Sequence, residues 1–198
     1  MNQSMTTDLK QGLERFKQFR SGQTGERMFY HPTCHPSQPT GFCPCDQAWP
    51  ATIWYYFKST LLLTALKLPF NTLKIAVLRW SGARVGRNVF ISTDVWIDPT
   101  FPELLLIEDE VMVGVGAKIF FHLFNRDYFQ AGRVTLGKGT IIGASALIGP
   151  GVEIGTGAVV ALGAVVRCDV PAGKAAIGNP AQITSLGSSR TVGAQPHE

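Results

Sequence analysis

A six-residue period runs through the stretch from Leu136 to Pro171 and restricts the folds open to this chain. In six successive hexads the first place is aliphatic, the second is mostly glycine and the fifth is small or β-branched. The first places are Leu136, Ile142, Ile148, Ile154, Val160 and Val166. A short period sustained in this way is the sign of a solenoid, and hexads predict a parallel β-helix built from one short strand and one turn per hexad.

Each place of the hexad has distinct expected surroundings. Three hexads close one triangular coil, and the coils stack at the ordinary strand spacing of about 4.8 Å. The first-place side chains point inward, and the fifth-place side chains fill the interior near the corners. The fourth place turns the corner, where left-handed backbone angles favour glycine and are tolerated by asparagine and aspartate. Because each coil passes its hydrogen bonds to the next, no hexad is stable alone.

The repeat begins at Val85 and is interrupted twice. A four-residue slip, Glu103–Leu106, follows the first coil, and the hexads then resume until IFFHLF, which starts at Ile119. The period fails again over Leu123–Thr135, which we predict to be an insertion projecting from a corner. We expect about four coils in all, with the insertion after the second.

The residues before the repeat are predicted to form helices and loops. Asp8 is a candidate cap for a helix that runs to about Arg20. Residues 21–50 contain five prolines and are expected to form a loop. Two apolar helices are expected next, from about Thr52 to Leu66 and, capped by Asn71, to about Trp80.

The predicted division has three parts. Residues 1–82 form a helical and loop extension, residues 83–186 form the β-helix domain, and residues 187–198 form a disordered tail. The expected fold class is therefore an all-β core, a parallel β-helix of hexapeptide repeats, with an α-helical N-terminal extension.

The helices predicted at 51–80 are apolar almost all round, so something must cover them. Packing on the end of the β-helix or against a partner subunit is the favoured explanation. The alternative is peripheral contact with a membrane surface, which aromatic side chains and lysines suit. No stretch reaches the roughly 18 uncharged apolar residues of a membrane span.

The overall charge and the termini indicate an ordinary cytoplasmic protein. The net charge is +4 and the basic residues are scattered, so nucleic-acid binding is not expected. The amino terminus lacks the apolar core of a signal peptide. Four cysteines without such a signal favour a reducing cytoplasm and free thiols.

The proline-rich loop contains ligand types that suit zinc. They are His31, Cys34, His35, Cys43 and Cys45. Their spacing is not that of a standard zinc finger, because Cys-Pro-Cys replaces the usual two-residue gap. An extended loop that wraps the domain or a neighbouring subunit is the favoured reading, with a metal site as the alternative.

His122 is the only histidine within the repeat. It occupies the fourth place of its hexad, directly before the insertion, and the inward places there are expected to be Ile119 and Leu123. Histidine is the side chain best able to take up a proton near neutral pH. Its position beside the sole insertion favours a functional role. No carboxylate is evident to orient it, and Asp127 and Glu110 are candidates by proximity only.

The segments IIGASALIGPGVEIGTGAVVALGAVV, DVPAG and IGNPAQI resemble the hexapeptide-repeat acyltransferases. The layout of residues 70–181 is similar to the exopolysaccharide, colanic-acid-type branch. The segment HLFNRDYFQAGRVTLG also resembles the repeat domain at the end of some non-ribosomal peptide synthetases. The resemblance implies a left-handed coil, a homotrimer with active sites between subunits, and acetyl-CoA or another acyl-CoA as donor, with no metal required.

The resemblance also implies roles for particular residues. His122 matches the family's catalytic base, which takes a proton from a hydroxyl or amine of a small-molecule or saccharide acceptor. No acyl-enzyme is implied, and nothing marks Cys168 as an activated thiol. The residues that match the coenzyme A site, from pantetheine to phosphates and adenine, are Gly143, Ser145, Ala161, Gly163, Arg167, Lys174, Asn179 and Pro180. One departure is Ile141, where many relatives carry tryptophan, and the short aromatic insertion favours a small or apolar acceptor over a sugar.

Three other functions share the predicted fold. A γ-type carbonic anhydrase needs three histidines around zinc, whereas this repeat contains one. A nucleotidyltransferase would need a separate α/β domain, for which the sequence has no counterpart. A non-catalytic scaffold or binding module remains the alternative to an acyltransferase.

Overall fold

Three sheets, which the chain visits in rotation and which are parallel except for one terminal strand, form the body of the protein. The computed structural model describes residues 3–32, 49–124 and 128–186. One sheet contains β2 (Arg84–Val85), β5 (Leu105–Ile107), β10 (Val134–Leu136) and β13 (Glu153–Ile154). A second contains β3 (Phe90–Ile91), β6 (Met112–Val113), β11 (Ile141–Ile142), β14 (Val159–Val160), β16 (Lys174–Ile177) and β17 (Gln182–Ser185). The third contains β4 (Trp96–Ile97), β7 (Lys118–Ile119), β12 (Leu147–Ile148) and β15 (Val165–Val166).

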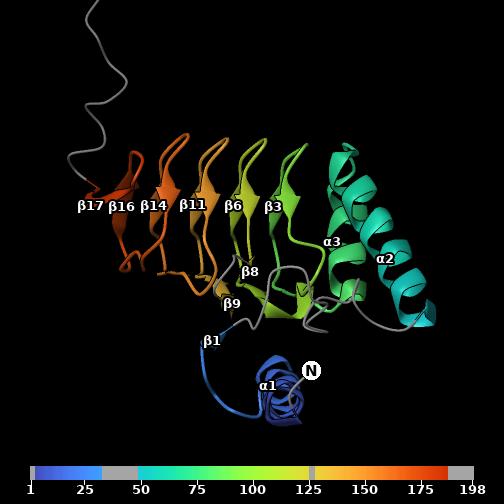
Figure 1. Ribbon diagram of the computed structural model, residues 1–198. Helices are drawn as coiled ribbons and strands as arrows, with labels where there is room; N and C mark the ends of the chain where they lie inside the picture. Colours follow the sequence, from blue (N-terminus) through green and yellow to red (C-terminus); the bar gives the residue numbers. More distant parts are fainter. Residues whose placement is uncertain (1–2, 33–48, 125–127, 187–198) are drawn as a thin grey trace, which may run out of the picture.

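We call these the β2, β3 and β4 sheets after their first strands. The chain passes from one to the next at each corner, so that the rungs of the β3 sheet stand side by side in Figure 1. The register pairs one first-place residue with the next, as in Ile91, Val113, Ile142 and Val160. Four coils are present, with the insertion after the second, as the period predicts.

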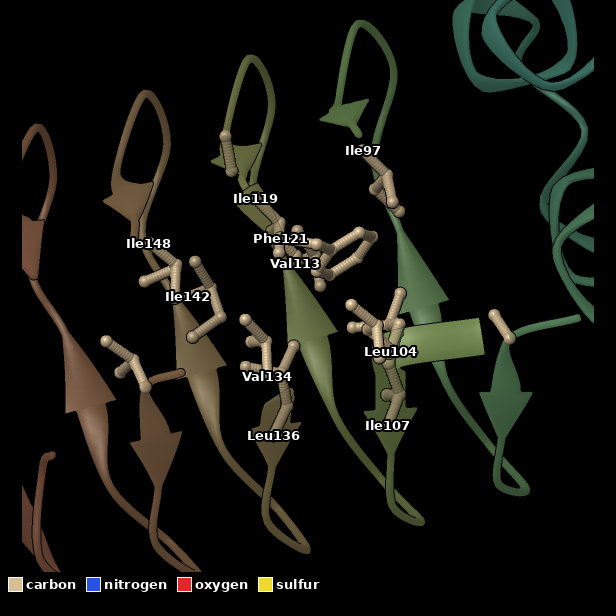
Figure 2. Close-up of a cluster of buried hydrophobic side chains, with 14 of the residues drawn as sticks. Ile97, Leu104, Ile107, Val113, Ile119, Phe121, Val134, Leu136, Ile142 and Ile148 are labelled. Atoms are coloured by element: carbon tan, nitrogen blue, oxygen red, sulfur yellow. The ribbon is translucent and has the colours of Figure 1, made fainter. Parts of the chain in front are cut away.

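The interior of the stack follows the hexad almost without exception. First-place side chains such as Ile107, Leu136 and Ile148 are fully buried, and they line the axis in Figure 2. Fifth-place side chains such as Ala146 and Ala158 are buried as well. The predicted inward position of Leu123 is wrong, because its side chain is 45% exposed. The chain leaves the coil at this hexad, and Phe121 fills the interior instead.

The corners adopt the left-handed backbone that the fourth places predict. Glycines with φ between 64° and 76° occupy five of these places, and Asn88, Asp94, Glu110 and Ser145 also have φ between 54° and 64°. The predicted slip, Glu103–Leu106, is divided between a short 3₁₀ helix, η2 (Pro102–Leu104), and the start of β5. The slip therefore adds residues between the first two coils without interrupting the stacked strands.

Second-place glycines are required where the backbone of the next coil passes close by. A Cβ on Gly137 would lie 2.7 Å from the backbone nitrogen of Thr156 and 2.8 Å from the carbonyl oxygen of Ile154. A Cβ on Gly149, at the same place of another hexad, would lie no nearer than 3.3 Å from any such atom. Neither glycine has a positive φ, so space alone distinguishes the two positions.

We expect Gly137→Ala to lower the free energy of unfolding by about 1–3 kcal/mol, because the backbone of two coils must separate to admit a methyl group. Gly149→Ala is the matched control and should cost less than about 1 kcal/mol, since alanine also restricts the unfolded chain. Denaturant unfolding of the two variants measures the difference. Equal losses in both would show that the close approach of coils does not explain the second-place glycines.

The N-terminal segment is more ordered than its composition suggests. Helix α1 (Gln3–Ser21) begins before Asp8, so the prediction of Asp8 as its cap is wrong. Residues 28–32, predicted as loop, form β1 (Met28–Pro32). This strand pairs antiparallel with β9 (Tyr128–Gly132), and β9 pairs with β8 (His122–Phe124). The predicted insertion is thus a hairpin, and a strand from the N-terminal segment completes its sheet.

Two helices cover the open end of the stack. Helix α2 (Trp49–Lys67) starts three residues earlier than predicted because Pro50 is tolerated in a first helical turn. Helix α3 (Asn71–Ser81) lies against β3, with α2 outside it (Figure 1). Gly82 ends α3 with the left-handed φ expected of a C-terminal glycine. Helix α2 also contacts β4, so packing on the end of the stack is confirmed for both helices.

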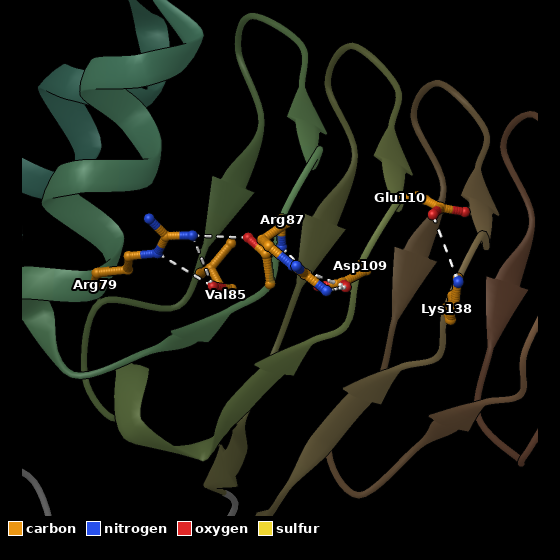
Figure 3. Close-up of polar contacts among 7 residues, drawn as sticks. Arg79, Val85, Arg87, Asp109, Glu110 and Lys138 are labelled. Atoms are coloured by element: carbon orange, nitrogen blue, oxygen red, sulfur yellow. Dashed lines mark hydrogen bonds and ion pairs between the residues drawn. The ribbon is translucent and has the colours of Figure 1, made fainter.

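Polar side chains of α3 occupy the hydrogen-bonding edge of the first coil. Asn71 does not cap the helix as predicted; its amide accepts from the Ile91 N–H and donates to the Val89 carbonyl, both at 2.9 Å. Lys74 is buried and donates to the carbonyls of Ile91 and Ser92. Arg79 holds the carbonyls of Val85 and Gly86, as Figure 3 shows for Val85. The helix thus satisfies backbone groups that a bare sheet edge would expose.

The far end of the stack is closed by a hairpin. Strand β16 continues the β3 sheet in parallel to β14, and β17 then returns antiparallel to β16. The intervening turn, residues 178–181, hydrogen bonds to Val165 on the β4 sheet. Residues 187–198, predicted as a tail, lie outside the described residues.

Candidate active site

His122 stands where the chain leaves the second coil to enter the hairpin. Its side chain is 27% exposed, and its Nδ1 lies 2.5 Å from Oδ2 of Asp98. Asp98 belongs to the coil below and is completely buried. The pairing of Ile97 with Ile119 sets the two coils in the register that brings these side chains together.

The carboxylate of Asp98 is held by the backbone as well as by histidine. Its Oδ1 accepts the Thr100 N–H at 2.9 Å, and its Oδ2 accepts the Phe121 N–H at 3.2 Å. Burial raises the pKa of this carboxyl, but hydrogen bonds and charge from His122, together with the bonds from Thr100, outweigh it and leave the pKa below its ordinary value. Asp98 is therefore an anion held in place beside Nδ1 of the imidazole ring.

This arrangement determines which nitrogen of His122 carries the proton. An ionised carboxylate only accepts hydrogen bonds, so Nδ1 of the neutral ring is the donor toward Asp98. The lone pair then resides on Nε2, which has no hydrogen-bond partner among the described residues and can accept a proton from another molecule. A histidine oriented by a buried carboxylate in this way is the geometry of a general base.

Aromatic side chains pack against the imidazole ring and restrict its orientation. Its centroid lies 5.5 Å from that of Phe101, in an edge-on contact, and 6.1 Å from that of Phe129 on β9. Phe16 of α1 packs on both of these rings at 5.1 and 5.2 Å. Phe129 of the hairpin therefore packs on the ring, and Phe16 of α1 packs on Phe101 and Phe129 behind it. The N-terminal segment thus helps to hold the site in place.

Asp98 is a candidate site residue that the sequence did not predict. The signal was present, because Asp98 occupies a second place in its hexad one coil before His122. The earlier candidates do not take its role. Glu110 forms an ion pair with Lys138 across the coils (Figure 3), and Asp127 lies outside the described residues.

A pocket of about 320 Å³ lies between the hairpin and the outer face of the β4 sheet. Its walls include Leu123, Tyr128 and Gln130 from the hairpin, and Leu147 and Arg167 from the sheet. The register pairs Leu123 with Gln130 and His122 with Ala131. Successive residues of a strand face opposite sides, so this pocket and His122 lie on opposite faces of the hairpin.

The residues matched to the coenzyme A site fall into two groups. Gly143, Ser145, Ala161 and Gly163 stack at the corner between the β3 and β4 sheets, where the Gly163 N–H donates to the Ala144 carbonyl at 2.9 Å. Arg167, Asn179 and Pro180 lie beside the β4 sheet, and Lys174 begins β16. His122 leaves from the corner between the β4 and β2 sheets. Within one chain, the first group and His122 therefore lie at opposite edges of the β4 sheet.

The metal prediction concerns mostly residues outside the described part of the chain. Cys34, His35, Cys43 and Cys45 lie there, whereas His31 is buried in β1 beside Gly12 of α1. Within residues 3–32, 49–124 and 128–186, no group of three or more metal-ligating side chains occurs. Cys168 is exposed and forms no disulfide with another described residue. Across the same ranges no helix is long and apolar enough to cross a membrane.

Comparison with known proteins shows which solved structures share the fold. No protein-family model and no curated protein sequence matches the chain. Solved structures do. A hexapeptide-repeat acetyltransferase of Vibrio cholerae, complexed with acetyl coenzyme A, has a TM-score of 0.54 at 19% identity over 70% of this chain and 91% of that one.

Two sugar acetyltransferases are similar to the same extent. A galactoside acetyltransferase in complex with coenzyme A has a TM-score of 0.54 at 16% identity, over 74% of this chain and 88% of that one. A maltose O-acetyltransferase from Clostridium difficile has a TM-score of 0.51 at 20% identity, over 67% and 84%. The chain therefore has the fold of the hexapeptide-repeat acetyltransferases. The narrower similarity to the colanic-acid branch and to peptide synthetases stays a prediction.

Proposed function

We propose that the protein is an acyltransferase that moves an acetyl or other acyl group from coenzyme A to a hydroxyl or amine of a small-molecule or saccharide acceptor. The observation that carries the proposal is the His122–Asp98 pair, with a half-buried imidazole whose Nε2 is free to act as a base. The fold shared with acetyltransferases, two of them holding coenzyme A or acetyl coenzyme A, supports the choice of donor.

The proposed reaction is a direct transfer. Nε2 of His122 removes the proton of the acceptor as its oxygen or nitrogen attacks the thioester carbonyl. The carbon–sulfur bond then breaks, and the imidazolium returns the proton to the departing thiolate of coenzyme A. Asp98 stabilises the imidazolium while it exists. Holding donor and acceptor together supplies much of the rate gain, and a corner backbone N–H is proposed to hold the oxyanion.

The donor is proposed to bind between neighbouring subunits of a homotrimer with left-handed coils. The pantetheine arm would lie along the corner of Gly143 and Gly163 in one subunit and reach His122 of the next. Arg167 and Lys174 would meet the phosphates, since both are exposed cations. This arrangement accounts for the separation of the two groups within a single chain.

An exposed apolar surface supports contact between copies. Phe90, Met112 and Ile141 are stacked on the outer face of the β3 sheet, and each is between 45% and 49% exposed. Leu162, at the adjoining corner, is 76% exposed. Contiguous apolar patches of this kind mark interaction sites, and this one borders the corner proposed to hold the pantetheine arm.

The proposal is tested by incubating the purified protein with acetyl-CoA and a panel of amino sugars, neutral saccharides, small alcohols and amines. We expect release of free coenzyme A thiol that depends on one class of acceptor, together with acetylated product detected by mass. Calorimetry with coenzyme A alone provides the binding control. A protein that binds no coenzyme A would instead favour the alternative of a non-catalytic scaffold.

A further inference from the structure

The outer face of α2 is unlike a helix surface that meets water. Its exposed residues include Ile53, Trp54, Phe57 and Leu61, and Lys67 is the single charged residue that it exposes. Helix α1 has the same length but exposes charges of both signs, including Lys10, Glu14, Arg15 and Lys17. The contrast within one molecule indicates that the outer face of α2 is adapted to another environment.

Aromatic side chains gather at one side of this face and join α2 to the end of α3. Trp54 stacks on Phe57 at 5.7 Å between ring centroids and meets Trp80 edge-on at 6.1 Å. All three side chains are about half exposed, between 49% and 56%. Lys58 places its ammonium 5.6 Å from the centre of the Trp80 ring. Tryptophan beside lysine is the composition that suits the boundary between lipid headgroups and acyl chains.

The charge of this part of the chain is of one sign. Residues 49–93 contain six basic residues and no aspartate or glutamate. The basic residues are Lys58, Lys67, Lys74, Arg79, Arg84 and Arg87. Lys74 is buried against carbonyl groups and Arg87 pairs with Asp109. The positive charge at the surface therefore comes from the other four, Lys58, Lys67, Arg79 and Arg84. A positive apolar surface complements a layer of anionic headgroups.

We propose that the outer face of the α2–α3 cap, centred on Trp54, Phe57 and Trp80, docks peripherally on an anionic lipid surface. The cap forms one end of the stack (Figure 1), so it can lie flat on a membrane without covering the sheets or the hairpin. Neither helix is long and apolar enough to span a bilayer, so the contact is interfacial. This face is distinct from the apolar surface around Met112 on the β3 sheet, which is proposed above to contact a second copy of the chain. The inference is independent of the proposed acyl transfer.

Vesicle sedimentation and tryptophan fluorescence test the proposal with the full-length protein. We expect binding to vesicles of phosphatidylcholine with phosphatidylglycerol, a blue shift of the emission, and little binding to phosphatidylcholine alone. Trp54→Ala should weaken binding about tenfold, because one large apolar side chain no longer enters the interface. Tyr30→Ala is the matched control, since Tyr30 is 57% exposed on β1, away from the cap, and it should bind like the wild type.

A second pair of variants tests the charge. Lys67→Glu should weaken binding to the anionic vesicles by about tenfold or more, whereas the same change at Lys10 on α1 should have little effect. Circular dichroism checks that each variant is folded. Absence of binding to anionic vesicles, or equal loss in the cap and control variants, would overturn the proposal. A change of oligomeric state on Trp54→Ala would also overturn it, because a second copy of the chain would then be the occupant.

Discussion

His122→Ala is expected to lower kcat for acyl transfer by about 10²–10⁴-fold, the range that a positioned general base contributes. Coenzyme A should still bind, because Gly143, Ser145, Ala161 and Gly163, which are proposed to contact its pantetheine arm, lie at another corner of the coil. Steady-state kinetics with the acceptor found in the panel, together with calorimetry for coenzyme A, measure both quantities. Added imidazole is expected to restore part of the rate by entering the space that the side chain leaves.

Cys168→Ala is the control for this experiment. The thiol is exposed in the repeat and is the kind of nucleophile that an acyl-enzyme mechanism would need. Direct transfer predicts an unchanged rate for this variant and no acylated protein by mass. Unchanged turnover in His122→Ala would remove the base from the mechanism, and loss of turnover in Cys168→Ala would require an acyl-enzyme.

Asp98→Asn is expected to lower kcat by about 10²-fold or more with little change in KM. An asparagine amide can donate to Nδ1, which would move the ring proton to Nε2 and leave no base facing the acceptor. Asp98 does not touch substrate in this account and is a positioning residue. Nitrogen NMR of labelled histidine therefore supplies the deciding readout, because the proton should shift from Nδ1 to Nε2.

The ionisation of Asp98 sharpens this prediction. Hydrogen bonds hold the pKa of its carboxyl below the ordinary value, so the wild type keeps the anion throughout the neutral range. Any acid limb of the pH–rate profile near neutrality must then arise from another group. Wild-type kcat in Asp98→Asn with the proton still on Nδ1 would show that the carboxylate only supports the fold.

The hexad could be followed from sequence because its places repeat. Burial of Ile107, Leu136 and Ala146 follows directly from a period in which backbone sterics and side-chain volume recur at every turn. The same logic failed at Leu123, where the chain leaves the coil. It also failed for β1, since a strand next to prolines is formed by pairing with a distant hairpin and not by local preference.

Of the two paired residues of the candidate site, only His122 could be predicted from the sequence. His122 was visible because it interrupts a pattern. Asp98 was not, because its contact with His122 depends on the register between successive coils and on the burial of a charged group that sequence alone places at the surface. Asn71 is a similar case: a good helix cap by composition, it pairs with a sheet edge that lies about 20 residues along the chain.

A crystal structure with coenzyme A bound would show whether the thiol lies beside His122. We expect the thiol at the corner near His122, with space for one acceptor atom between the sulfur and Nε2, about 3 Å from each. It also predicts that the pantetheine arm contacts Gly143 and Gly163 of one subunit while His122 comes from its neighbour. A thiol that lies away from His122, for example in the pocket lined by Leu123 and Arg167, would contradict the assignment of His122 as the base.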